Sequence, residues 1–470
     1  MLKATGALAA SAVLLASAAY AQAPAKPDEA SFRALYKELV ETNTSLSAGD
    51  CTLAANRMAA HLKAAGFPDS DVTVWTAPGH PKEGGLIAVL PGKDPKAKAI
   101  LLLAHIDVVE AKREDWTRDP FTLIEEKGFF YARGASDMKS QDAAWVDTMV
   151  RLREEGFKHR RDIKMALTCG EETNGAFNGA EYLAKNKRDA IDAAFALNEG
   201  ANGELDENGK PVVHMVLASE KMSQNYKLEV TNPGGHSSQP TPDNAIYHLA
   251  RALDRISRYE FPIQLNDANR AFFTKMAAIS PAEQAAAMRA IVANPSDAHA
   301  NEVLSRDKAY HSMLRTTCVA TMLSAGHATN ALPQRATANV NCRIFPGVSR
   351  EAVMAALVKA ADDPAVHFSV PEVRGAPLTS PPLTPQIMGP IEKISNEMWP
   401  GVPVVPFLLA GATDGTALSA GGIPTYGVSG LFSGPDGGNI HGLNERIGVQ
   451  SLYEGREFLY RLVKAYADQP

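Results

Sequence analysis

The sequence has few cysteines and no block of basic residues. Four cysteines among 470 residues are too few for the dense disulfide scaffold of a small secreted domain. The formal net charge is −6, and no basic segment is interleaved with aromatic residues, which argues against nucleic acid and an anionic membrane surface as partners. Beyond the N-terminus, no apolar run is long enough to cross a bilayer. Small molecules and peptides remain as expected ligands.

The N-terminus has the features of a secretory signal peptide. Lys3 is the only charged residue before an apolar run from Ala7 to Ala19, and Ala19-Tyr20-Ala21 has the small-x-small pattern of a cleavage site. We therefore exclude residues 1–21 from the fold. The mature protein is expected to be exported, either to the periplasm or into the medium.

The four cysteines fall in different predicted elements. Cys51 lies in a helical pattern, Cys169 follows an apolar strand, and Cys318 and Cys342 lie in two candidate strands of one region. A Cys318–Cys342 disulfide is an alternative in an oxidising compartment, but the prediction is two buried thiols.

The apolar run from Ala99 to Ala104 predicts a strand that is buried on both faces. It ends in His105-Ile106-Asp107, and residues two apart on a strand point to the same side. A histidine that meets a carboxylate with its second ring nitrogen is well suited to bind a metal. A polar strand end in contact with solvent is the alternative.

Further carboxylates follow in comparable positions. Asp137 lies where a turn-rich segment enters a helix from Gln141 to about Glu155, a place where the positive helix end or a metal would favour its charge. Glu171 and Glu172 follow a predicted strand and would repel each other in a dry site unless cations lay between them. A dinuclear metal centre satisfies both observations.

The order of elements indicates an α/β fold with a second domain inserted. Up to Glu199, strands alternate with helices and polar residues gather after the strands, which is typical of an open sheet with ligands at its carboxyl edge. Near Met222 the order becomes that of a ferredoxin-like βαββαβ layer, with a helical insertion at about 260–312. The predicted domains are a first domain, residues 22–221 and 373–470, and an inserted second domain, residues 222–372; the resemblance given below implies that they are the catalytic domain and a lid or dimerisation domain.

Seven motifs in this order resemble one superfamily. The resemblance is to the co-catalytic zinc hydrolases that include aminoacylases, bacterial glutamate carboxypeptidases, carnosinases and succinyl-diaminopimelate desuccinylases, and it covers nearly all of the mature chain. The motifs are LLLAHIDVV, ARGASDMKS, GEETNG, NEG, NPGGHSSQP, GATDG and IHGLNE. The resemblance implies a catalytic domain with a mixed sheet flanked by helices, and an inserted ferredoxin-like lid.

The resemblance also implies a site with two zinc ions, for which cobalt or manganese are alternatives. Asp137 would bridge the ions, and a cis peptide bond is expected after it. Asp107 would orient a histidine ligand, and Glu171 would be the general base. The implied metal ligands are His105, Asp137, Glu172, Glu199 and His441.

Substrate binding is implied at positions outside the metal ligands. Arg343, Asn330 and the backbone from Gly411 to Thr413 match positions that hold the substrate carboxylate in relatives; for Arg343 a surface arginine is the alternative. His236 matches a histidine that reaches the active site of the other subunit in a lid-mediated homodimer and stabilises the oxyanion. A surface-loop histidine is the alternative there.

These features favour a hydrolase of the carboxypeptidase or dipeptidase kind, acting on short peptides or N-blocked amino acids. The alternative is an N-acyl-amino-acid deacylase, because Glu199 is glutamate as in the deacylases, whereas several peptidases have aspartate there. In both cases the leaving amino acid has a free carboxylate. A non-catalytic protein that binds peptide or metal is a third hypothesis, which the presence of Glu171 disfavours.

Overall fold

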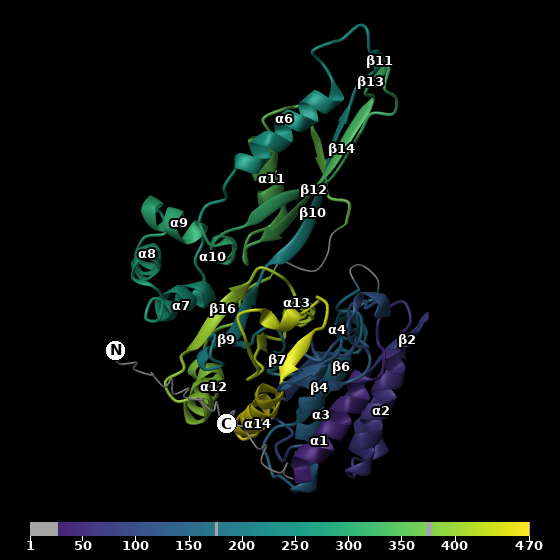
Figure 1. Ribbon diagram of the computed structural model, residues 1–470, viewed down its shortest axis with the longest axis vertical. Coiled ribbons are helices and arrows are strands. Elements are labelled where there is room, and N and C mark those ends of the chain that lie inside the picture. Colours follow the sequence, from purple (N-terminus) through teal and green to yellow (C-terminus); the bar gives the residue numbers. More distant parts are fainter. Residues whose placement is uncertain (1–26, 174–176, 373–377, 470) are drawn as a thin grey trace, which may run out of the picture.

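The computed structural model describes residues 27–173, 177–372 and 378–469. The predicted signal peptide and the residues Asn174-Gly175 of GEETNG lie outside these ranges. Figure 1 shows a broad main unit, formed by the two ends of the described chain, and a narrow lid, residues 222–372, that extends from it. The domain limits stay a prediction.

The main unit is built on a mixed sheet of ten strands. Strands β3, β6 and β7 are parallel neighbours, so their carboxyl ends lie at one edge. Along the sheet the strands are β1 (Val72–Ala77), β2 (His80–Leu90), β6 (Ile163–Thr168), β3 (Ile100–His105), β7 (Phe195–Asn198), β17 (Thr425–Gly427), β9 (Pro211–Glu220), β8 (Gly203–Leu205) and β18 (Phe432–Ser433), with β16 (Val404–Leu409) beside β9.

Helices cover both faces of this sheet. The two faces of β3 lie in different cores, since Leu102 packs with the helices α1, α2, α3 and α14 whereas Leu101 and Leu103 pack near α4 and α13. This is why the run is apolar at every position. The helices are α1 (Pro27–Val40), α2 (Cys51–Ala64), α3 (Lys139–Glu154), α4 (Gly179–Asn186), α5 (Arg188–Ile191), α12 (Pro385–Met398), α13 (Gly415–Ala420) and α14 (Val449–Ala467).

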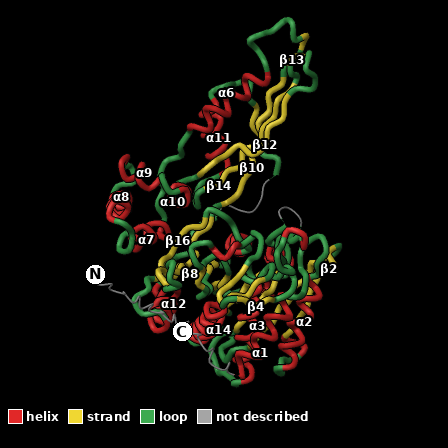
Figure 2. Tube along the Cα trace, viewed as in Figure 1, coloured by secondary structure: helices red, strands yellow, loops and turns green. Residues whose placement is uncertain are grey.

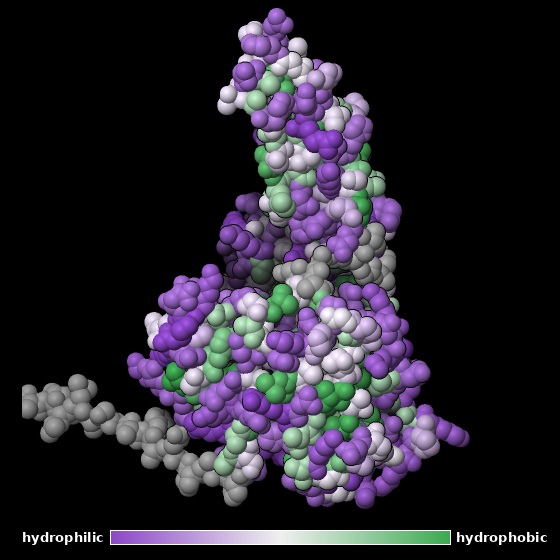
Figure 3. Space-filling model, turned by 90° about the vertical axis from the view of Figure 1, so that its right-hand side faces the viewer, coloured by the Kyte–Doolittle hydropathy of each residue, from purple (hydrophilic) through white to green (hydrophobic). Residues whose placement is uncertain are grey.

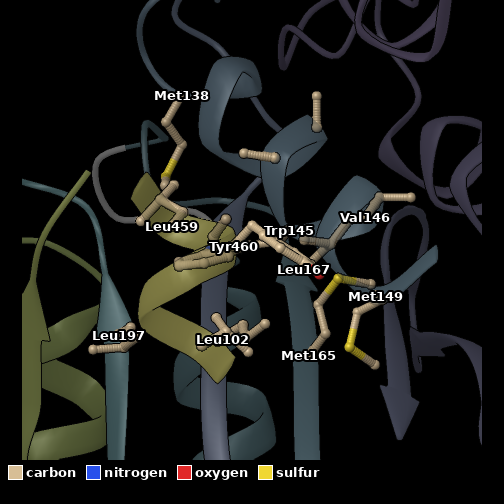
Figure 4. Close-up of a cluster of buried hydrophobic side chains, with 14 of the residues drawn as sticks. Leu102, Met138, Trp145, Val146, Met149, Met165, Leu167, Leu197, Leu459 and Tyr460 are labelled. Atoms are coloured by element: carbon tan, nitrogen blue, oxygen red, sulfur yellow. The ribbon is translucent and has the colours of Figure 1, made fainter. Parts of the chain in front are cut away.

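The core below the carboxyl edge is densely packed. Figure 4 shows Trp145 of α3 among Leu102 of β3, Met165 of β6 and Leu459 of α14. The Trp145 Nε1–H donates to the carbonyl oxygen of Leu103 at 3.1 Å. This contact fixes α3, and with it the turn that precedes α3, relative to β3.

Short elements complete the main unit. They comprise a sheet of β4 (Ile124–Glu126), β5 (Phe129–Tyr131) and β19 (Arg446–Gly448), and the 3₁₀ turns Asp69–Asp71, Arg113–Asp115 and Gly437–Asn439. None of the helices in the described ranges combines the length and hydropathy needed to cross a bilayer. The face in Figure 3 is largely hydrophilic, with scattered hydrophobic residues.

The lid has the predicted βαββαβ order. Its antiparallel sheet runs β12 (Thr317–Ala325), β14 (Arg335–Ile344), β10 (Met222–Thr231) and β15 (His367–Ser369), and the helices α6 (Ala245–Arg258) and α11 (Arg350–Ala361) pack on it. A two-stranded antiparallel sheet of β11 (Gly235–His236) and β13 (Ala331–Leu332) forms its tip, at the end far from the main unit (Figures 1 and 2).

The insertion is helical, as predicted, and has a core of its own. Its helices are α7 (Asp267–Met276), α8 (Ala282–Ala293), α9 (Ala298–Ser305) and α10 (Lys308–Met313). Phe272, Met288 and Leu304 of these helices pack together with Val213 of β9 and Val405 of β16. The insertion therefore covers one face of the sheet where β9 and β16 run side by side.

The cysteine prediction is wrong, because all four cysteines form disulfides. Cys318 and Cys342 are directly opposite each other in the β12–β14 ladder, which brings their sulfurs together. Cys51 of α2 and Cys169 after β6 form the second disulfide across 118 residues. The latter pair ties α2 to the segment that carries Glu171.

His214 of β9 is fully buried. Its Nδ1 lies 2.7 Å from Ser395 Oγ, and the rings of Trp399, Phe432 and Phe458 surround it. Burial lowers the pKa of His214 to about 3, whereas a histidine in an unfolded chain has a pKa of about 6.5. The unfolded state therefore binds a proton at a higher pH than the folded state, and stability falls as the pH decreases from about 6.5 towards 3.

We expect His214 to lower the free energy of unfolding by about 1.4 kcal/mol per pH unit below 6.5, or on the order of 2 kcal/mol at pH 5. In His214→Gln, which cannot be protonated, the free energy should fall less between pH 7 and pH 5. Urea unfolding at both pH values measures the difference. His299→Ala, at an exposed position of α9, is the matched control with an unchanged slope; equal slopes for wild type and His214→Gln would contradict this expectation.

Candidate metal centre

Strand β3 places His105 at the carboxyl edge of the sheet, and Asp107 follows two residues later. His105 Nδ1 lies 3.1 Å from the carbonyl oxygen of Asp107 and 3.6 Å from its Oδ1. Because oxygens face Nδ1, this nitrogen would carry the proton when a cation is bound, and Nε2 would be the ligand atom. The Asp107 carboxylate also accepts the backbone N–H groups of Glu171 at 3.4 Å and Glu172 at 3.0 Å, and so joins two loops of the site.

Asp137 lies between two histidines. His105 Nε2 is 3.5 Å from Asp137 Oδ1 and 3.5 Å from Glu199 Oε1. His441 Nε2 is 3.1 Å from Asp137 Oδ2 and 2.8 Å from Glu172 Oε1. Burial opposes the ionisation of Asp137, but hydrogen bonds from both histidines outweigh it and hold its pKa below the ordinary value. The chain thus brings together two sets of three ligands that share Asp137, each with its ligand atoms within 4.8 Å of one another.

Glu445 holds the turn that leads to Asp137. Its Oε1 accepts the backbone N–H groups of Ser136 at 2.8 Å and Asp137 at 2.9 Å. Its Oε2 accepts from the Gly134 N–H at 3.0 Å and from Arg133 Nη1 at 2.7 Å. Because Glu445 is fully buried and meets four donors, removing it would leave these donors unpaired. Sequence analysis did not assign it a role, although it closes the IHGLNE motif.

The backbone has unusual conformations at or next to three of the candidate metal ligands. The peptide bond between Asp137 and Met138 is cis, as the resemblance implied. His441 has a φ of 61°, in the left-handed region that is costly for residues other than glycine. Gly200, next to the ligand Glu199, has a φ of 95°, and a Cβ there would lie 2.5 Å from a leucine side chain of β9. Glycine is therefore required at the end of the NEG motif.

Glu171 lies beside the ligands and forms a third candidate set with His105 and Glu172. Burial, opposed by His105 and reinforced by Glu199, Asp414 and Glu172, raises the pKa of Glu171 to about 10. Burial likewise raises the pKa of Glu199. The carboxylates are thus close enough to oppose one another's ionisation.

This donor set fits divalent cations. It offers imidazole nitrogens and carboxylate oxygens, which suit zinc, and no thiolate, since all four cysteines are in disulfides. A cation within each set would offset the repulsion between its carboxylates. The five predicted ligands are the residues that compose the two sets sharing Asp137.

Metal removal is expected to lower the melting temperature by several degrees. A cation that binds only the folded state stabilises it by about 2.7 kcal/mol at 100 times its Kd, and each kcal/mol shifts the Tm by about 2–4 °C in a domain of moderate size. Asp137→Ala should abolish this difference, because both sets lose a ligand, whereas Glu207→Ala, at an exposed position, should retain it. The Tm of each variant is measured with and without chelator. If chelator does not change the Tm of the wild type, no cation is bound.

The predicted substrate-binding residues of the lid lie in two places. His236 and Asn330 are exposed at the tip, where the Ser237 N–H donates to the carbonyl oxygen of Asn330 at 3.1 Å. Arg343 lies at the base of the lid sheet, half-buried and paired in the ladder with Ser223. The tip is distant from the metal ligands of the same chain (Figure 1).

The remaining predicted residues, Gly411 and Thr413, follow β16. The Thr413 N–H donates to Glu220 Oε1 at 2.7 Å, and Thr413 Oγ1 accepts from Asn198 Nδ2 at 3.0 Å. The Thr413 N–H is therefore already paired in this conformation. Glu220, whose pKa burial raises to about 8, was not predicted as a site residue; its position at the end of an apolar run was the available signal.

Asp414 is another carboxylate without a predicted role. It is buried, and it accepts hydrogen bonds from Thr168 Oγ1 at 2.7 Å and from Asn178 Nδ2 at 2.7 Å. These contacts join the loop after β16 to the loop after β6, which carries Glu171 and Glu172. Its place in GATDG, shortly after a predicted strand, could have indicated a site residue.

Comparisons with known proteins agree with this geometry. The sequence profile of peptidase family M20/M25/M40 matches residues 101–465. The N-fatty-acyl-amino acid synthase/hydrolase PM20D1 of Mus musculus is 28% identical over 385 residues, which cover 80% of this chain and 75% of that protein. Aminoacylase-1A of Rattus norvegicus is 27% identical over 397 residues, covering 82% and 85%.

A solved structure with the same fold is the M20 family metallo-carboxypeptidase Sso-CP2 from Sulfolobus solfataricus. Its TM-score is 0.66 at 19% identity, covering 94% of this chain and 100% of that chain. At this level of identity the likeness establishes the fold, which is a catalytic domain with a lid. It does not identify the substrate.

Proposed function

Because the chain belongs to peptidase family M20/M25/M40 and is a hydrolase acting on amide bonds, we propose that it hydrolyses N-acyl amino acids with two bound divalent cations. The observation that carries this proposal is the pair of ligand sets that share Asp137, with the Glu171 carboxylate beside them. The proposed cations are zinc, with cobalt or manganese as alternatives that suit the same ligands.

Bound cations would polarise the scissile carbonyl and lower the pKa of the attacking water. Glu171 then takes a proton from this water and delivers it to the leaving nitrogen, so that one water and one amide yield a carboxylate and an amine. Asp107 would keep the proton of His105 on Nδ1, so that Nε2 is available to bind a cation. Glu445 keeps Asp137 in place through the backbone of its turn.

Two features favour an N-acyl amino acid over a peptide. Glu199 is glutamate, as in the deacylases that the sequence resembles, and the similar proteins PM20D1 and aminoacylase-1A are named for N-acyl amino acid or acyl chemistry. The carboxypeptidase or dipeptidase activity predicted first is the second candidate, since it has the same leaving group. The half-buried guanidinium of Arg343, which has no hydrogen-bond or ion-pair partner among the described residues, suits the free carboxylate in both cases.

The proposed active form is a homodimer joined through the lid. Strand β12 is an edge of the lid sheet, and its Val319, Met322 and Leu323 are 60%, 70% and 67% exposed. An open apolar edge strand is a typical surface for pairing with a second chain. A second copy would also give His236, at the lid tip, an active site to reach.

Export to the periplasm or the medium is part of the proposal. Two disulfides favour an oxidising compartment, where such bonds form and persist. This agrees with the signal peptide predicted at residues 1–21.

A substrate panel tests the proposed function. Metal-loaded protein is assayed with N-acetyl amino acids, the same compounds as C-terminal amides, and dipeptides. We expect hydrolysis of the N-acetyl amino acids and little of the amides, which lack the carboxylate. Cleavage of dipeptides alone would favour the second candidate, and binding without turnover would favour a non-catalytic binding protein.

A further inference from the structure

We infer that the groove beside the metal centre, formed by β8, β9 and β16, holds a long apolar acyl chain of the substrate. This inference rests on the proposed function and specifies the class of acyl group. A cavity of about 200 Å³ is lined by Asp137 and Glu199. A larger one, of about 540 Å³, lies next to it, and Asn202 and Ile440 line both. A chain attached to a carbonyl at the metal ligands can therefore continue into the groove.

The groove lining is mostly apolar. Leu205, Met215, Phe407 and Ile440 contribute side chains to it, and Glu204 is the only ionisable residue in the lining described. Without a lysine or arginine in this lining, the groove offers no partner for an anionic group. An uncharged hydrocarbon chain matches these walls.

The sheet explains why apolar residues are exposed here. Val213 and Met215 lie on one face of β9, and Val405 and Phe407 lie on the same face of the parallel neighbour β16. The insertion helices bury Val213 and Val405 but leave Met215 and Phe407 half-buried. The groove is thus the continuation of an apolar sheet face past the edge of the insertion, next to α7 (Figure 1).

The inserted helices pack in the same apolar cluster as two residues of the groove lining. Tyr310 of α10 packs against the same apolar cluster as Met215 and Phe407.

The test is a homologous series of N-acyl amino acids, from acetyl to hexadecanoyl, with one amino acid and below the concentrations at which micelles form. We expect kcat/KM to rise by about two- to fourfold per methylene until the groove is filled, which is the range for partly to fully buried methylenes. Affinity for the Glu171→Ala variant, measured by calorimetry without turnover, should rise in parallel.

Two variants show whether the acyl chain binds in the groove or binds nonspecifically to apolar surface elsewhere. Phe407→Ala should lower the ratio of kcat/KM for dodecanoyl over acetyl substrate by about tenfold, the effect of losing most of one buried apolar contact. Val212→Ala, at an exposed apolar position of β9 outside the groove, is the matched control and should keep the wild-type ratio.

The outcomes distinguish this inference from the proposed function. Hydrolysis of acetyl substrates with no gain from longer chains, or equal ratios for Phe407→Ala and wild type, would overturn the groove inference and leave the proposed function intact. Absence of hydrolysis for every N-acyl amino acid would overturn both.

Discussion

Glu171→Ala is expected to retain its metal and to lose turnover by at least ~10²–10⁴-fold. Glu171 lies outside the two ligand sets that share Asp137, so its loss should leave each cation with its ligands. Glu172 and Glu199 cannot replace it as a base, because both belong to the ligand sets. Glu172 lies 2.8 Å from His441, and Glu199 lies 3.5 Å from His105. Removal of the base therefore affects proton transfer and spares metal binding.

The neighbouring residue gives the matched control. Glu172 has the same side chain one position along, but its Oε1 lies 2.8 Å from His441 Nε2 in a ligand set. Glu172→Ala should therefore lose metal and activity together. Elemental analysis beside steady-state kinetics separates the two variants. Metal loss in Glu171→Ala would make Glu171 a ligand, and full turnover would remove it from the mechanism.

Some of the candidate ligands could be predicted from local rules, whereas the complete set, with Glu199 and His441, was implied by the resemblance. A strand that is apolar at every position must be covered on both faces, which made β3 recognisable, and His105 follows directly from where β3 ends. Asp50, a residue type typical of N-caps, precedes α2 and accepts from the Leu53 N–H at 2.8 Å. The βαββαβ order of the lid was predictable for the same reason, since the spacing of apolar residues changes between its strands and helices.

Contacts between distant segments could not be predicted. The run from Val212 to Ser219 does not alternate, and periodicity cannot distinguish a buried strand from a buried helix, so β9 was missed. Glu220 accepts a hydrogen bond from the Thr413 N–H, and these two residues are 193 positions apart in the sequence. The Cys51–Cys169 disulfide joins a helix to a strand end across 118 residues. Such pairings are properties of the folded chain.

His236→Ala is expected to lower turnover by ~10²–10³-fold without loss of metal, the effect of removing one oxyanion donor. His236 Nδ1 accepts the Ser238 N–H at 3.1 Å. A backbone N–H can only donate, so Nδ1 is unprotonated and the neutral ring carries its proton on Nε2. No residue that the structure describes accepts from this Nε2–H, so it is available as a donor at the lid tip. His299→Ala, at an exposed position of α9, is the control that should keep full turnover.

Mixing two inactive variants tests whether this donor acts on the partner subunit. In a heterodimer of His236→Ala and Glu171→Ala chains, one active site combines an intact Glu171 with an intact His236 of the partner. If the donor acts between subunits, activity returns on mixing, because neither homodimer contains such a site. Native mass spectrometry verifies that heterodimers form. Within one chain, β11 lies far from the metal ligands, so His236 is expected to act on the partner subunit. If heterodimers form and remain inactive, His236 acts within its own subunit or has no part in the mechanism.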